Sequence, residues 1–314
     1  MVVRIVKNWD FPELIKQSPG ARGEIGDIVF TTDPVPESDY VIVFNTVEQP
    51  VEVNCPSENI WAVMQEPYIP GIFEWMVKGH KQYARVYTHH LFSDDAKYVA
   101  SYPMLPWHVQ KSYDELKDMP VPEKTELLSS IISNKAFFPG HKKRLKFVER
   151  LRQDSSLMID MYGKGIRYIE DKWDALAPYK YSLAIENSRS RDYWTEKLAD
   201  CFLSYTMPIY YGCENLEEYF PKDAFIRIDI NRPEEAIAII RKTIASGAWE
   251  KNLDAITEAR NLVLNKYNFF FNMASIIREE PTCDGSRAGV KILKPYKRTL
   301  WERIVGRIKR TFHD

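Results

Sequence analysis

The stretch from Tyr181 to Lys197 combines a strand pattern, a polar loop and a helix start, which in α/β proteins is a common place for a ligand site. It opens with the apolar run YSLAI, passes through Glu186-Asn187 and the loop SRSRD, and then resumes an apolar period. Asp192 is the candidate N-cap of the helix that follows. The apolar period predicts one buried helical stripe, formed by Leu198, Cys201, Phe202 and Tyr205.

Tyr193, Glu196 and Lys197 fall in the first turns of this predicted helix. Unpaired backbone N–H groups and the helix dipole favour an anion there, and Lys197 adds a positive charge suited to phosphate. An ionised Glu196 is a hydrogen-bond acceptor and so suits the hydroxyls of a ribose. The competing interpretation is a solvated Glu-Lys pair, with Glu186-Asn187 forming only a turn.

Glu66 lies in a second polar loop, MQEPYIP, directly after the apolar strand pattern IWAVM. From its residues alone, Glu66 is interpreted as a surface glutamate in a proline-rich turn, which is where most glutamates lie. The alternative is a general base that removes a proton from an attacking hydroxyl.

His89, His90, Asp94 and Asp95 in THHLFSDD have side chains that bind metals. Neighbouring residues on an extended segment point to opposite faces, however, so adjacent ligands chelate poorly. The sequence therefore predicts no metal site. The basic pattern GHKKRLKFVERL has an apolar stripe to bury, and its Lys and Arg residues are interpreted as a solvated helix face.

Strands and helices in alternation position these loops. In the first hundred residues, strands are predicted at Val2–Val6, Ile28–Thr31, Tyr40–Phe44, Ile60–Met64 and Tyr83–Thr88, with helical or turn segments at Pro12–Gln17 and Ile72–Gly79. Runs without polar alternation predict strands that are buried on both faces. The predicted fold class is α/β.

A linker is predicted at Lys117–Lys124, where KDMPVPEK supplies two prolines and no apolar period. The pattern then restarts, with strands at Leu127–Ser133, Ser156–Tyr162, Tyr181–Glu186, Pro208–Tyr211 and Phe225–Asp229, and helices at Lys142–Gln153, Tyr193–Tyr205, Pro233–Ala245 and Leu253–Asn272. This alternation predicts a second, largely parallel sheet with ligands at the carboxyl ends of its strands.

Composition restricts the classes of protein. The chain has 314 residues, 45% of them hydrophobic and 28% charged, which is a globular balance. A formal net charge of −1 argues against a general nucleic-acid binder. The four cysteines form no C-x-x-C pair, so we expect no zinc site, no disulfide framework and a reducing, cytoplasmic compartment. No apolar run is long enough to predict a secretory signal or a membrane span.

Beside these patterns, the segment Tyr179–Asp229 resembles a known family. The runs YKYSLAIENS, DYWTEKL, MPIYYG and YFPKDAFIRID, with their spacings, resemble the signature region of the α1,3/4-fucosyltransferases, glycosyltransferase family 10, including its bacterial members. KTELLSSIISN and LMIDMYGKG resemble upstream parts of the same family. The resemblance covers residues 124–245, and residues 60–108 more loosely.

The resemblance implies two facing Rossmann-like domains in the GT-B arrangement. Residues 1–120 would form the acceptor-binding domain and residues 124–280 the nucleotide-sugar (donor) domain, followed by a tail at 281–314. It also implies inversion at the sugar carbon, GDP-fucose as the donor substrate and no required cofactor.

Four residues correspond to family residues that contact the GDP moiety: Asn187, Tyr193, Glu196 and Lys197. A further cation for the diphosphate corresponds to Lys164 or Arg167, of which Arg167 offers a bidentate fork. Lys143 or Arg144 is another candidate in the basic helix. Glu66 corresponds to the family's catalytic base, and Asp94 or Asp95 is the alternative.

The predicted reaction is therefore transfer of fucose from GDP-fucose to a glycan hydroxyl, with a bacterial surface polysaccharide or lipopolysaccharide as the expected acceptor. Two alternatives stay open: a glycosyltransferase for another nucleotide sugar, and a non-catalytic nucleotide- or glycan-binding module.

The tail at 296–314 predicts a basic amphipathic helix. Its apolar face contains Leu300, Trp301, Ile304, Val305, Ile308 and Phe312, and Arg and Lys residues occupy the rest. Such a helix lies on an anionic membrane or packs against protein. The first interpretation places the chain at the inner face of the cytoplasmic membrane.

Overall fold

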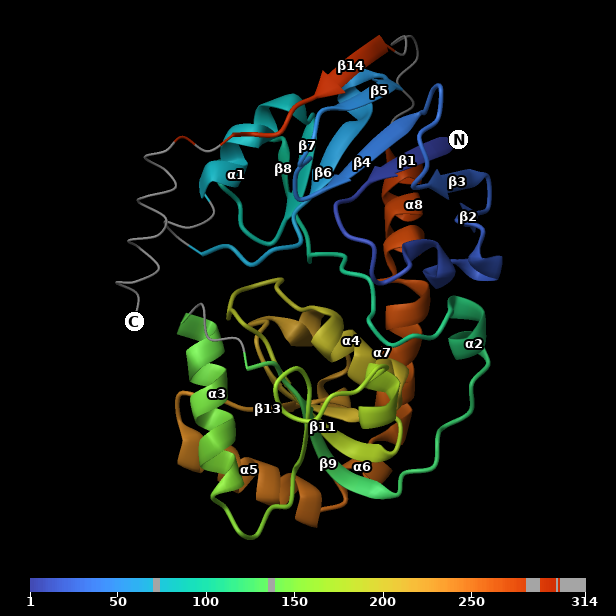
Figure 1. The fold of residues 1–314 in the computed structure, drawn as a ribbon. Coiled ribbons are helices and arrows are strands. Elements are labelled where there is room, and N and C mark those ends of the chain that lie inside the picture. Colours follow the sequence, from blue (N-terminus) through green and yellow to red (C-terminus); the bar gives the residue numbers. More distant parts are fainter. Residues whose placement is uncertain (70–73, 135–138, 281–288, 298, 300–314) are drawn as a thin grey trace. The chain divides into compact units, whose positions relative to one another are not determined.

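The computed structural model describes residues 1–69, 74–134, 139–280, 289–297 and 299. The chain divides into two compact units. The first contains Met1–Pro106, Ser112–Asp114 and the chain from Asn268 onward, and the second contains Trp107–Lys111 and Glu115–Tyr267. Figure 1 shows a sheet with helices in each unit. Both units are of the α/β class.

The sheet of the first unit has seven strands in the order β2-β3-β1-β4-β6-β7-β8. All neighbours pair in parallel except β2 with β3. The central strands β4 and β6 are buried along their whole length, as their unbroken apolar runs predict. The strands are β1 (Val2–Val6), β2 (Glu24–Ile25), β3 (Ile28–Thr31), β4 (Tyr40–Phe44), β6 (Ile60–Val63), β7 (Arg85–Thr88) and β8 (Tyr98–Ala100).

Late parts of the chain complete this first unit. Strand β14 (Gly289–Leu293) pairs antiparallel with β5 (Val51–Cys55), and helix α8 (Phe269–Glu279) packs beside the first strands. Phe270 is fully buried, with its ring edge-on to Phe30 at 5.3 Å between centroids. Residues 268–280 therefore differ from the predicted boundary, because their aromatic side chains are buried in the first unit rather than the second.

The sheet of the second unit has five parallel strands in the order β10-β9-β11-β12-β13. Their carboxyl ends therefore meet at one edge. The strands are β9 (Glu126–Ile131), β10 (Asp160–Tyr162), β11 (Tyr179–Ile185), β12 (Met207–Tyr211) and β13 (Ile226–Arg227).

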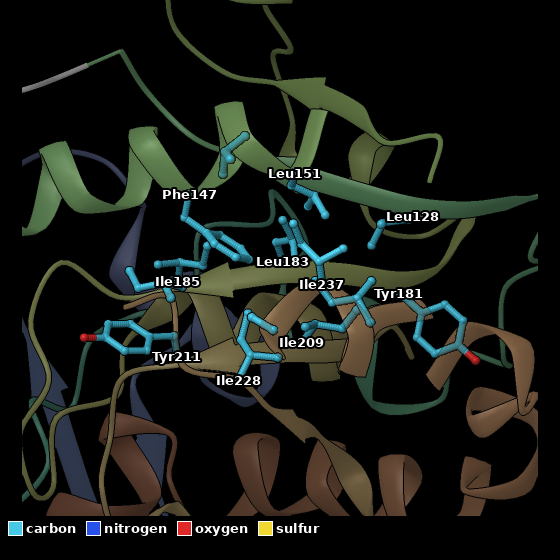
Figure 2. Packing of buried hydrophobic residues seen from close by; sticks show 14 of the residues in the cluster. Leu128, Phe147, Leu151, Tyr181, Leu183, Ile185, Ile209, Tyr211, Ile228 and Ile237 are labelled. Atoms are coloured by element: carbon cyan, nitrogen blue, oxygen red, sulfur yellow. The ribbon is translucent and has the colours of Figure 1, made fainter. Parts of the chain in front are cut away.

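A hydrophobic core joins this second sheet to its helices. Phe147 and Leu151 of α3, together with Ile237 of α5, pack on the face of β11 and β12 that carries Leu183 and Ile209 (Figure 2). Helix α4 contacts the same two strands and α7. The helices are α3 (Pro139–Arg152), α4 (Glu196–Leu203), α5 (Pro233–Ala245), α6 (Ala248–Lys251) and α7 (Leu253–Asn265); α1 (Glu74–Gly79) lies in the first unit, and α2 (Tyr113–Lys117) lies where the chain passes into the second.

The predicted helix Leu253–Asn272 is wrong as a single element. The chain leaves the helical path after α7, and Asn268 starts α8 by accepting a hydrogen bond from Phe270 N at 2.9 Å. The Asn268 side chain also donates to Gln17 O at 2.6 Å, which ties the helix start to the first unit. An N-cap inside an apolar run was thus read as helix interior.

The predicted tail helix lies outside the described residues, apart from its first few positions. In the parts of the chain that the structure describes, no helix is both long enough and apolar enough to cross a membrane.

Candidate functional site

Glu186 follows β11 directly and is fully buried. Its backbone N–H donates to Tyr211 O at 2.8 Å, which continues the ladder with β12. Its carboxylate accepts from Thr195 N at 2.9 Å, from Thr195 Oγ1 at 2.8 Å and from Lys197 Nζ at 3.1 Å. The end of the strand is therefore joined to the start of α4 through one carboxylate.

Thr195 is the N-cap of α4, since its Oγ1 accepts from Lys197 N at 3.3 Å. The prediction of Asp192 as the cap is wrong. Asp192 has a left-handed φ of 59°, and its Oδ1 accepts from Asn215 Nδ2 at 2.8 Å and from Tyr219 OH at 2.7 Å. It shapes the loop ahead of the helix, and the helix starts four residues later than the candidate cap.

The three predicted residues around the helix start differ in exposure. Tyr193 lies before the helix and is 3% exposed, whereas the side chains of Glu196 and Lys197 are 13% and 21% exposed. Of the three, only the charged pair is partly exposed, at the position where a helix start favours an anion.

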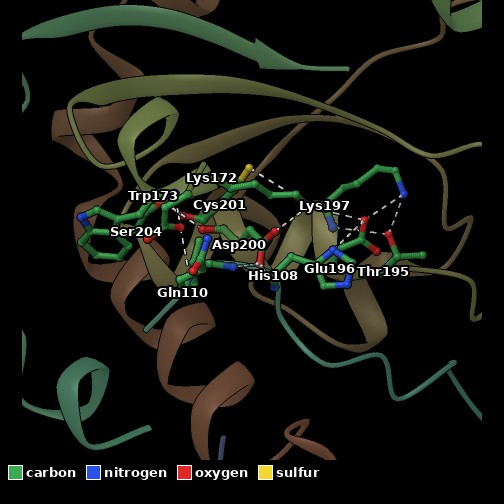
Figure 3. Close-up of polar contacts among 12 residues, drawn as sticks. His108, Gln110, Lys172, Trp173, Thr195, Glu196, Lys197, Asp200, Cys201 and Ser204 are labelled. Carbon is green, nitrogen blue, oxygen red and sulfur yellow. Dashed lines mark hydrogen bonds and ion pairs between the residues drawn. The ribbon is translucent and has the colours of Figure 1, made fainter. Parts of the chain in front are cut away.

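Several charges surround Glu196 (Figure 3). Its Oε1 lies 3.4 Å from Lys197 Nζ, 3.6 Å from Lys172 Nζ and 4.0 Å from His108 Nδ1. Burial alone raises the pKa of Glu196, but Lys197, Lys172 and His108 together bring it well below the usual range. Burial likewise lowers the pKa of Lys197, which Glu186 and Glu196 then raise above its ordinary value. Both groups are therefore charged at neutral pH.

Arg144 of α3 reaches the same strand edge. Its Nη1 donates to Asn187 Oδ1 at 2.9 Å, and its Nη2 donates to Ser133 O at 3.3 Å, while its buried Nε has no hydrogen-bond acceptor among the described residues. Gly140 allows this approach, because a Cβ there would lie 1.8 Å from Asn187 O. Asn187 and Arg144, both sequence candidates, are thus brought together, and Arg144 is the better placed of the two basic-helix candidates.

Lys164 and Arg167 lie in the loop after β10, at the same carboxyl edge as Glu186 but with β9 between the two strands. Both are exposed. Arg167 lies over the ring of Tyr162, 5.0 Å from its centroid, and its Nη1 is 3.4 Å from the Tyr162 hydroxyl. Their role toward a diphosphate stays a prediction.

Glu66 lies in the first unit, just beyond β6, and is exposed. Asn45, buried and with a left-handed φ of 59°, ends the neighbouring strand β4. Its Oδ1 accepts from Gln65 N at 2.7 Å and from Glu66 N at 3.2 Å. One side chain therefore fixes the backbone that carries Glu66. The alternative bases Asp94 and Asp95 are exposed in the loop after β7.

The two histidines of that loop brace the segment after Glu66. Tyr68 N donates to His89 Nε2 at 3.1 Å, and the ring of Tyr68 stacks on His90 with centroids 3.8 Å apart. Across the described residues, no group of three or more His, Cys, Asp or Glu side chains is arranged to hold a metal ion.

A family comparison matches most of the second unit. Residues 121–245 match the model described as Glycosyltransferase family 10 (fucosyltransferase) C-term. These residues form a family 10 glycosyltransferase domain. The family predicted from YKYSLAIENS and DYWTEKL is therefore confirmed, and Glu186 to Lys197 lie inside the matched region.

Relatives of the family 10 domain include 4-galactosyl-N-acetylglucosaminide 3-alpha-L-fucosyltransferase 9 of Mus musculus and of Homo sapiens. Each is 35% identical over 128 residues, which is 39% of this chain and 34% of the relative. The chain thus spans about a third of the length of these curated relatives, and the match falls short of their full length.

Solved structures show the same fold. An α1,3-fucosyltransferase with GDP-fucose superposes with a TM-score of 0.51 at 19% identity, over 90% of this chain and 91% of that one. The apo structure of OtsA gives a TM-score of 0.50 at 8% identity, over 78% of this chain and 74% of that one. The predicted α/β fold of the GT-B class is confirmed.

Sequence reasoning missed three residues of the candidate site: His108, Lys172 and Asp200. They contact Glu196 or one another but are distant in sequence, and Lys172 and Asp200 form an ion pair at 2.8 Å. The one available signal was Asp200, a carboxylate within the apolar stripe of a helix and four residues after Glu196.

Gly212→Ala tests the buried carboxylate. A Cβ at Gly212 would lie 2.4 Å from Glu186 Cγ and 2.5 Å from the Tyr210 hydroxyl, so the contacts of the Glu186 side chain must be disturbed. We expect a lower melting temperature and weaker GDP binding, measured by thermal shift and calorimetry. Gly289→Ala is the matched control, because no atom of the described residues lies within 4 Å of its Cβ position. Equal behaviour of the two variants would contradict this account of the site.

Proposed function

We propose that this chain transfers fucose from GDP-fucose to a hydroxyl of a glycan, with inversion at the sugar carbon. The observation that carries the proposal is the charged pair of Glu196 and Lys197 at the start of α4, within a family 10 domain. The crystal structure of the similar α1,3-fucosyltransferase with GDP-fucose supports this donor.

The donor would bind along the carboxyl edge of β11. Lys197 and Arg144 supply positive charge for a diphosphate, and the Nε of Arg144 offers a hydrogen bond that the described residues leave unused. Glu196, kept ionised by its cationic neighbours, accepts hydrogen bonds from the ribose hydroxyls. Asn187 lies beside Arg144, and Tyr193 is buried just before the helix. Lys164 and Arg167 are further candidates for the diphosphate.

The chemistry needs one base and a stabilised leaving group. In the proposed step the Glu66 carboxylate takes the proton of the acceptor hydroxyl as its oxygen attacks the anomeric carbon. The bond from that carbon to the diphosphate oxygen breaks, and GDP leaves with its charge held by Lys197 and Arg144. No cofactor takes part in this step.

The acceptor is proposed from its chemistry and from the relatives. The name of the mammalian enzymes includes a 4-galactosyl-N-acetylglucosaminide acceptor, which supports a glycan hydroxyl as the acceptor here. Within that class we propose a bacterial surface polysaccharide or lipopolysaccharide, modified in the cytoplasm.

A donor screen tests the function. GDP and GDP-fucose are expected to raise the melting temperature, because a ligand that binds only the folded state stabilises it. UDP- and CMP-sugars are expected to leave the melting temperature unchanged. Turnover of another nucleotide sugar in place of GDP-fucose would replace the donor. Tight GDP binding with no transfer to any glycan would favour a binding module instead.

Glu66→Gln tests the base. General-base catalysis typically contributes about 10²- to 10⁴-fold, so kcat should fall by roughly that factor with GDP affinity unchanged. Asp94→Asn and Asp95→Asn test the alternative bases in parallel, and both variants are expected to keep full kcat. A Glu66→Gln enzyme with full kcat would reject Glu66 as the base.

We propose that residues 296–314 contact the anionic inner face of the cytoplasmic membrane, based on their basic amphipathic pattern. The full chain is expected to float with anionic vesicles, and a chain ending at residue 295 is not. Equal flotation of both chains would remove the proposal.

A further inference from the structure

A second lysine stands beside the carboxylate that the proposed donor site uses. Lys172 begins the 3-10 helix Lys172–Ala175, and its Nζ lies 2.8 Å from Asp200 Oδ2 and 3.6 Å from Glu196 Oε1 (Figure 3). Its side chain is 25% exposed and that of Asp200 is 1% exposed. The contact with Asp200 is therefore largely shielded from water, where an ion pair is stronger than at the surface.

Asp200 holds this lysine in place. It lies one helical turn after Glu196, and its Oδ1 accepts from His108 N at 2.7 Å and from Val109 N at 3.3 Å while Oδ2 takes Lys172. A buried carboxylate with three donors from two segments has little freedom to rotate.

The backbone around Lys172 is fixed from the other side. Asp171 caps the 3-10 helix by accepting from Trp173 N at 2.9 Å, and it also accepts from Gln110 N at 2.9 Å. Gln110 Nε2 in turn donates to Glu170 O at 2.8 Å. The backbone amides of residues 108 to 110 thus donate to the carboxylates of Asp200 and Asp171. The segment Trp107–Lys111 therefore holds Lys172 in place within the second unit.

Glu196 is consequently shared between two ammonium groups at nearly equal distances, 3.4 Å to Lys197 and 3.6 Å to Lys172. Lys197 is already the nearer of the two, and without Lys172 no second lysine would oppose it. The Glu196 carboxylate would then close onto Lys197 and compete with a diphosphate for that ammonium group.

We propose that Lys172, held by Asp200, is a positioning residue for the donor: it restrains the Glu196 carboxylate and so leaves Lys197 available to the diphosphate. This inference rests on the proposed function and adds a residue to the same site. Lys172 acts through Glu196 and need not touch the donor itself.

The test is GDP binding by calorimetry to Lys172→Met in the full-length chain. We expect GDP affinity to fall about tenfold, which corresponds to roughly 1.4 kcal/mol, and Lys172→Arg to restore most of it. Lys180→Met is the matched control, because Lys180 forms its ion pair with Glu250 at a more exposed position. In a Glu196→Gln background, Lys172→Met should cost little more affinity, since the residue it acts through is already neutral.

A pH profile separates positioning from a merely structural role. Removing a cation beside Glu196 raises the pKa of that carboxyl, because Lys172 is among the charges that lower it. On acidification, GDP affinity should therefore begin to fall at a higher pH in Lys172→Met than in the wild type. Gly212→Ala, which disturbs Glu186 without removing a cation, serves as the comparison for a structural disturbance of the same site.

Unchanged GDP affinity in Lys172→Met, or an equal further loss in the Glu196→Gln background, would overturn the inference while leaving the proposed function standing. A wild-type chain that binds no GDP would overturn both. If Lys172→Met does not fold, Asp200→Asn takes its place: it keeps the Oδ1 acceptor but weakens the hold on Lys172, and full GDP affinity in that variant would also overturn the inference.

Discussion

The carboxylate of Glu186 is buried next to the start of α4, and its hydrogen-bond donors come from residues at that helix start. Moving an ion out of water costs roughly several kcal/mol of free energy, which ion pairing and hydrogen bonds must offset. Thr195 supplies two donors and Lys197 a third. The position where α4 begins and the direction of Lys197 both follow from that requirement, which links the end of β11 to the ligand side of the helix.

The charges around this pair balance one another. Glu186, Glu196 and Asp200 are opposed by Lys172, Lys197 and Arg144 within one network. In the proposed function, an incoming diphosphate would therefore take over part of the cationic surface now turned toward carboxylates. A site of this kind keeps its cations ordered before the donor arrives, which is the preorganisation that favours stabilisation of a leaving group.

Local sequence patterns were enough to predict most of this architecture. The strands β1, β3 and β4 and the helix α5 have the predicted bounds, because their apolar periods end at clear turn or cap residues. The apolar period placed Glu196 and Lys197 in the first turns of a helix, and the family resemblance implied their role toward the donor. Asp192 was mistaken for the cap because a left-handed residue stabilised by Asn215 and Tyr219 has no local signature.

Long-range pairing was beyond the sequence patterns. The backbone N–H of His108 meets Asp200 across 92 residues, and β14 returns to β5 across more than 200. Such contacts depend on how the fold brings distant segments together, and the spacing of residues along the sequence does not predict them. For the same reason the sequence placed α8 with the second unit, although Phe269 and Phe270 are buried in the first.

The central claim is that Lys197, held against Glu186, is the main cation for the donor's diphosphate. The most direct measurement is the calorimetric affinity of Lys197→Met for GDP compared with guanosine, with circular dichroism to establish that the variant is folded. A folded Lys197→Met is expected to lose most of its preference for GDP over guanosine. A folded variant that retains the wild-type preference would contradict it.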